Sequence, residues 1–107
     1  VVENLPSTEM LLTKSGTEYE KYMTSINRVA FNYLVKLREI TLPDSIQRIG
    51  NQAFGFNEQL AKVVMPQGIS YIQYNAFNNS NKVVLNVAEG TYAEAFAIKY
   101  GIAYTIR

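Results

Sequence analysis

The segment Leu37–Phe54 reads LREITLPDSIQRIGNQAF, and it recurs 23 residues later at Leu60–Phe77 as LAKVVMPQGISYIQYNAF. The matched positions are apolar or proline, whereas the positions between them differ freely, as Glu39 against Lys62 shows. Stacked coils require this pattern, because each coil presents the same inward side chains to its neighbours while its outward side chains face water. The two copies therefore predict a repeat architecture.

A third, weaker copy precedes the other two. Its apolar positions, each 23 residues before a matched one, are Met23, Ile26, Ala30, Phe31 and Leu37. Thr17 and Tyr19 stand where isoleucine and leucine are expected, and Glu20 replaces the proline. A degenerate copy is expected of a terminal coil with solvent or a cap on one side. The alternative is a chance amphipathic pattern of similar period.

One coil is best analysed in the second copy. Leu60–Met65 alternates as a short strand, and Pro66 ends it because proline donates no ladder hydrogen bond. The next apolar residues are two isoleucines three apart and then an adjacent Ala-Phe pair, which predicts one helical or 3₁₀ turn with an apolar face; they are Ile69, Ile72, Ala76 and Phe77. Asn78–Asn81 is a turn cluster, preferred over a Ca²⁺ site because such a site normally needs several carboxylates. Successive strands should pair in parallel, about 4.8 Å apart.

The Leu37–Phe54 pattern, Leu-x-x-Ile-x-Leu-Pro-x-x-Ile-x-x-Ile-Gly-x-x-Ala-Phe, resembles the bacterial BspA-type leucine-rich repeat. The second copy departs from it by having Gln73 in place of glycine. The family often carries a cysteine three residues before the leading leucine, where this chain has Leu34, Asn57 and Ser80. The resemblance covers about residues 17–107, and the period lies within the range of roughly 20 to 29 residues of leucine-rich repeats.

Repeat and resemblance together predict an α/β fold, a right-handed leucine-rich-repeat solenoid of about three 23-residue coils with a C-terminal helical cap. Residues 1–16 would be an N-terminal cap or the remnant of an upstream region, residues 17–87 the repeats, and residues 88–107 the cap. Ser7 or Thr8 could begin a short helix in the first of these segments. The expected core is Ile26, Ile40, Leu42, Ile46, Ile49, Phe54, Val63, Met65, Ile69, Ile72 and Phe77.

The C-terminal segment departs from the repeat. Leu85 and Val87 match Val63 and Met65 only after one residue is deleted. Thr91-Tyr-Ala-Glu94 is a capping box, which predicts a helix over about 92–100, ended by a left-handed Gly101. The expected buried stripe of that helix is Ala93, Phe96, Ala97 and Tyr100, and the final alternating strand is Ile102, Tyr104 and Ile106. We expect this segment to cover the last open strand edge rather than to bind a partner.

Composition excludes several functions. Ten basic and nine acidic residues give a net charge of +1, which argues against a nucleic-acid partner. Without cysteine or histidine, zinc fingers, thiol nucleophiles and imidazole-dependent triads are excluded. Apolar runs are far shorter than the roughly 20 residues of a membrane span, so no membrane insertion is expected. No catalytic, cofactor or metal set emerges, and Glu18 and Glu20 are interpreted as a solvated strand face.

The best candidate site is the outward row of strand residues on the expected concave surface. Its members are Glu39, Thr41, Lys62, Val64, Val84 and Asn86, with Glu18 and Glu20 as an extension. Solenoids commonly bind partners on that surface, although plain solvent exposure is the alternative. A second candidate is the tyrosine set Tyr71, Tyr74, Tyr92 and Tyr100. Tyrosine is enriched at interfaces but also pads convex arms and caps.

These features predict a non-enzymatic protein-interaction module. The resemblance implies a secreted or cell-surface bacterial protein that adheres to a host or matrix glycoprotein, as a monomer or weak dimer. The alternative is a structural spacer, or an array-terminating module of a larger surface protein, with no ligand of its own. An enzyme is the third possibility. Because the chain begins with Val1 rather than methionine, we expect a processed or excised product.

Overall fold

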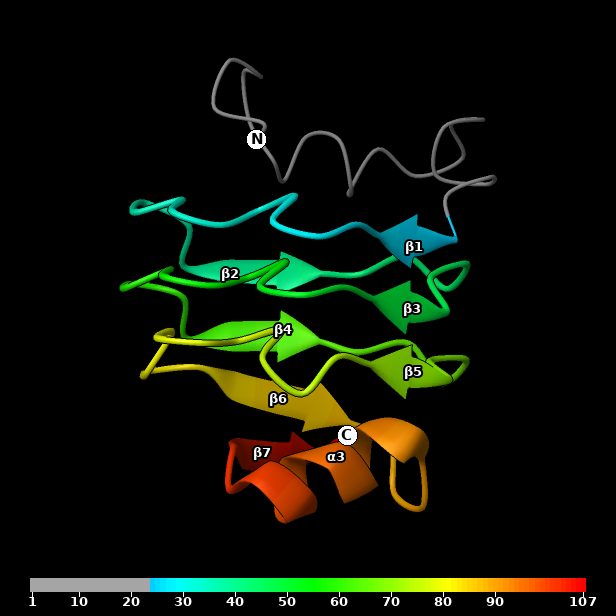
Figure 1. Ribbon diagram of the computed structural model, residues 1–107. Helices are drawn as coiled ribbons and strands as arrows, with labels where there is room; N and C mark the ends of the chain where they lie inside the picture. The colour runs from blue at the N-terminus through cyan, green and yellow to red at the C-terminus, as the bar shows by residue number, and fades with distance from the viewer. Residues whose placement is uncertain (1–23) are drawn as a thin grey trace.

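The computed structural model describes residues 24–107, which form two parallel β-sheets and one helix (Figure 1). The first sheet has the order β1-β3-β5 and the second the order β2-β4-β6-β7. The first comprises the two-residue strands β1 (Ser25–Ile26), β3 (Arg48–Ile49) and β5 (Tyr71–Ile72). The second comprises β2 (Glu39–Thr41), β4 (Lys62–Val64), β6 (Val84–Val87) and β7 (Ala103–Ile106). The predicted α/β class with parallel strands is confirmed.

The strand register follows the sequence repeat. Ile26 pairs with Ile49, and Ile49 pairs with Ile72, so each partner lies 23 positions along the chain. In the second sheet Ile40 pairs with Val63 at the same spacing. Val63 then pairs with Leu85, which confirms the one-residue deletion expected before the third strand.

The first sheet was not predicted from the sequence. The apolar residues from Ile69 to Phe77 were expected to form a helical or 3₁₀ turn, but the segment contains strand β5 between two turns. Ile69 follows the turn at Gln67 and Gly68, Ile72 is the second residue of β5, and both are buried. A two-residue strand is too short to show a period of two, so its apolar spacing resembled a helical one.

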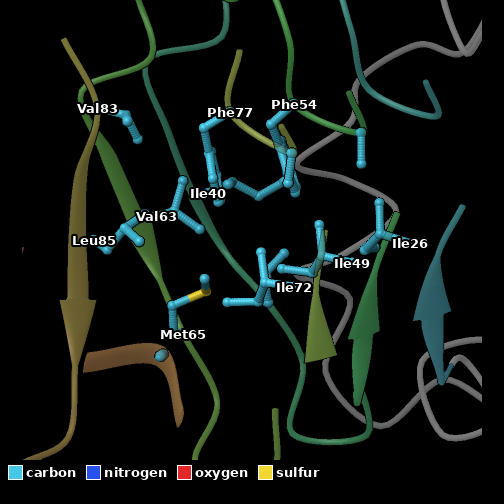
Figure 2. Packing of buried hydrophobic residues seen from close by; sticks show 14 of the residues in the cluster. Ile26, Ile40, Ile49, Phe54, Val63, Met65, Ile72, Phe77, Val83 and Leu85 are labelled. Atoms are coloured by element: carbon cyan, nitrogen blue, oxygen red, sulfur yellow. The ribbon is translucent and has the colours of Figure 1, made fainter. Parts of the chain in front are cut away.

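The core lies between the two sheets, and all eleven predicted core residues are buried. Figure 2 shows Ile26, Ile49 and Ile72 from one sheet pointing toward the side of Val63 and Leu85 from the other. A phenylalanine stack closes one end of this layer. Its rings are Phe31, Phe54 and Phe77, with successive centroids 5.5 Å apart.

The turns that close the layer carry buried polar side chains. Asn57 accepts the backbone N–H of Leu34 at 2.7 Å and donates to the carbonyl oxygen of Phe31 at 2.9 Å. One repeat later, Ser80 accepts the N–H of Asn57 and donates to the carbonyl oxygen of Phe54. Each polar side chain therefore satisfies two backbone groups of the preceding turn, which lie where no strand can pair with them.

Helix α3 (Tyr92–Tyr100) follows β6 and packs against both sheets near the C-terminal end of the stack (Figure 1). The Thr91 cap is confirmed, because Thr91 Oγ1 accepts from Glu94 N. Glu94 reaches back as predicted, but Glu94 Oε1 accepts from Gly90 N, one residue before the N-cap, rather than from Thr91 N. Gly101 is left-handed, with φ 67°. The predicted stripe is wrong in one member, because Tyr100 is 43% exposed and only leans on the Phe96 ring.

The closing segment moves the open edge rather than removing it. β7 pairs with β6 in parallel, and among residues 24–107 no strand pairs with the other side of β7. The expectation that this segment covers the edge of the last repeat strand is therefore confirmed for β6, and β7 becomes the last strand of the second sheet among the described residues. The expectations for residues 1–16 and for the strand around Thr17 and Tyr19 lie outside the described residues, as do Glu18 and Glu20.

Candidate functional site

The six candidate residues lie on the outward side of three adjacent strands, a surface called here the outer strand face. The register pairs Glu39 with Lys62 and Thr41 with Val64 between β2 and β4. It then pairs Val64 with Asn86 between β4 and β6. Val84 lies two positions before Asn86 on β6 and extends the Glu39 row. Sequence spacing alone thus placed these residues in two rows.

The six residues of the outer strand face differ in solvent exposure. Glu39, Thr41 and Lys62 are exposed, whereas the others are half-buried: Val64, Val84 and Asn86. Opposite charges occupy the directly paired positions of Glu39 and Lys62. An exposed pair of this kind contributes only about 0–1 kcal/mol to stability, so its charges remain available to a partner.

The fourth strand adds two residues that the sequence analysis missed. Ala103 pairs with Val84 and Thr105 pairs with Asn86, so both continue the rows of the outer strand face. Asn86 Nδ2 donates to Thr105 Oγ1 at 2.9 Å, which links the strands on this face. The signal was available, because alternation of Ile102, Tyr104 and Ile106 leaves the odd-numbered residues on the opposite side.

An open hollow of about 420 Å³ lies where the strands of the second sheet end. Its lining residues come from the turns after β2 and β4 and from the residue after β7: Asp44, Gln67, Gly68 and Arg107. One carboxylate and one guanidinium therefore flank the hollow. It offers polar and charged contacts next to the carboxyl ends of the strands.

The tyrosine set does not converge on one site. Tyr71 lies under the Arg48 guanidinium, 5.5 Å from ring centroid to Cζ, and its hydroxyl donates to Gln73 Oε1. Tyr92 Oη accepts the N–H of Ile72 at 3.3 Å, at the last strand of the first sheet. Tyr74 is exposed. The contacts of Tyr71 and Tyr92 fit the padding and capping role that was the alternative to an interface.

Within residues 24–107 no group of three or more histidine, cysteine, aspartate or glutamate side chains could hold a metal ion. In the same part of the chain, no helix has the length and apolar character needed to cross a membrane.

The stacked parallel strands with a period of 23 residues define a leucine-rich repeat protein. A family model described as "BspA type Leucine rich repeat region (6 copies)" matches residues 15–97, so the chain belongs to the BspA-type leucine-rich repeat family. No curated protein and no solved structure matches the chain. Repeat modules of this kind generally mediate protein–protein interaction and are generally non-enzymatic.

Proposed function

We propose that this chain is a non-enzymatic module that binds a protein through its outer strand face. One observation carries the proposal: the paired positions Glu39 and Lys62 stand beside the Thr41–Val64–Asn86 row. Interfaces combine an apolar centre with polar residues at the rim, and this surface offers half-buried Val64 next to exposed charges. None of these side chains contributes to the core, so they are free to vary for recognition.

The partner that we propose is a host or matrix glycoprotein, and the setting is a secreted or cell-surface bacterial protein. Membership of the BspA-type family supports this setting, since such repeats are typical of bacterial surface proteins. For the fold, we propose that the two ladders wind as a right-handed solenoid of about three coils. In this arrangement residues 17–87 are the repeats and residues 88–107 the cap, with residues 1–16 preceding them.

The test measures binding of the chain to immobilised matrix and plasma glycoproteins. The variant Glu39→Lys/Lys62→Glu exchanges the two charges, which preserves the net charge but inverts the local pattern. The matched control Glu58→Lys/Lys82→Glu exchanges two exposed charges in turns. We expect saturable binding that the first variant weakens at least tenfold and the control leaves unchanged, with equal melting temperatures for all three proteins.

A specific observation supports the alternative, an array-terminating module without a ligand. The Tyr92 hydroxyl and helix α3 cover the last strand of the first sheet, as a terminating segment would. Absence of binding from a cooperatively melting sample would contradict the adhesion proposal and favour this role. Equal loss of binding in both charge-exchange variants would also contradict it, because the attraction would then not depend on the outer strand face.

A further inference from the structure

Among residues 24–107, β7 is the last strand of the second sheet, and its outer edge pairs with no other strand (Figure 1). Arg107 N donates to the carbonyl oxygen of Val87, so Arg107 directs its main-chain groups toward β6. Because these groups alternate in direction along a strand, Thr105 does the same, while Tyr104 and Ile106 direct theirs outward. Two N–H groups and two carbonyl oxygens therefore face away from the sheet.

The rows of buried apolar side chains that cross the second sheet end at β7. Tyr104 pairs with Leu85 and Ile106 with Val87, and both partners are fully buried. Tyr104 itself is 36% exposed and Ile106 is 48% exposed. Helix α3 packs on β7 but leaves these two side chains partly uncovered. An occupant of the edge must therefore supply both an extended backbone and apolar side chains at alternate positions.

We infer that a second copy of this chain occupies the edge, through antiparallel pairing of β7 with β7 about a two-fold axis at Thr105. In this register Tyr104 of each copy lies opposite Ile106 of the other copy. Each of these two residue pairs exchanges two backbone N–H···O=C hydrogen bonds, which gives four in total. Each Tyr104 side chain then lies opposite an Ile106 side chain, a favourable aromatic and β-branched pair. The strand is thus complementary to itself, as a two-fold interface requires.

Other features of the edge fit the same occupant. The residues Tyr104, Thr105 and Ile106 favour strands, and β7 contains neither proline nor a charged residue of the kind that blocks edge pairing. Thr105 meets Thr105 of the partner copy on the opposite face, which is also a favourable pair. Because only a four-residue strand is covered, association should be weak, with a dissociation constant of about 0.1–1 mM.

Single cysteine substitutions test the pairing and its register. Because the chain contains no cysteine, any disulfide must join the introduced residues of two copies. Thr105→Cys places its thiol on the two-fold axis, where Cα atoms of a non-hydrogen-bonded pair are about 4.5 Å apart and can form a disulfide. Ala103→Cys is the matched control on the same strand and face. Its two Cα atoms would be about 14 Å apart, beyond disulfide reach. We expect rapid oxidation to a covalent dimer for Thr105→Cys only.

Sedimentation equilibrium and amide exchange of the chain up to about 1 mM give independent readouts. We expect dimer formation with concentration, together with slower exchange of the Tyr104 and Ile106 amides. Ile106→Lys should weaken dimerisation at least tenfold, whereas Ile98→Lys, at a helix residue 61% exposed, should not. A monomer throughout the range, equal cross-linking of both cysteine variants, or equal weakening by both lysine variants would overturn the proposal.

Discussion

Asn57 donates its backbone N–H to Ser80 Oγ at 2.9 Å, and both residues are buried although both are polar. They occupy equivalent positions of successive repeats, where BspA-type repeats often carry a cysteine and this chain does not. A thiol is a weak hydrogen-bonding group, whereas an amide and a hydroxyl both accept and donate strongly. Here the two side chains bind the backbone of the preceding turn, so they hold successive turns in register.

Asn57→Ala should lower the free energy of unfolding by about 2–4 kcal/mol, because it leaves the Leu34 N–H and the Phe31 carbonyl without their side-chain partner. Urea denaturation followed by circular dichroism measures the change. Asn81→Ala, at an exposed turn residue nearby, is the control and should cost less than about 0.5 kcal/mol. Equal losses in the two variants would show that the buried contacts of Asn57 contribute nothing specific.

Phe54→Ala should cost about 3–5 kcal/mol, because Phe54 is fully buried and stacks on Phe31 and Phe77 at the same time. Phe56→Ala should cost only about 1 kcal/mol, since Phe56 is partly exposed and stacks on the exposed Tyr33 ring. Thermal and urea unfolding of both variants give the comparison. A similar melting temperature for wild type and Phe54→Ala would refute the packed core.

Gly50→Ala should destabilise the protein by about 1–3 kcal/mol, because the added Cβ would lie 2.8 Å from the backbone nitrogen of Arg28 in the preceding repeat. Gly68→Ala provides the control, since its nearest atom is the Asp44 carbonyl oxygen at 3.8 Å. That variant should stay within about 0.5 kcal/mol of wild type. If Gly50→Ala unfolds at the same urea concentration as Gly68→Ala, the close approach of the two backbones is not present in solution.

Tyr92→Phe should cost about 1 kcal/mol, because Ile72 N–H at the end of the first sheet loses its acceptor. Amide exchange should locate the effect, with faster exchange at Ile72 and little change in β6. Tyr74→Phe removes a hydroxyl from an exposed ring and should be neutral. Unchanged exchange at Ile72 would mean that water serves this group as well as the tyrosine does.

The extent of sequence-based prediction differs between the two sheets. The second sheet followed from the repeat, because its strands alternate and end at a proline in two copies, Pro43 and Pro66. The first sheet did not, because strands as short as Arg48–Ile49 contain no period to detect. Candidate residues on β2, β4 and β6 were placed in rows by the spacing, whereas Ala103 and Thr105 were missed because the partner of the final strand was not specified by the repeat.

The sequence by itself determined the repeat, the buried columns and the helix ends, because each depends on local spacing or on the identity of single residues such as Thr91 and Gly101. Only the tertiary structure decided the pairing of β7 with β6 and the exposure of Tyr104 and Ile106. The reason is physical: the preferences and the alternation of neighbouring residues determine that a strand forms and which of its side chains share a face. Which backbone it pairs with, and which edge stays open, depends on contacts between segments distant in the chain.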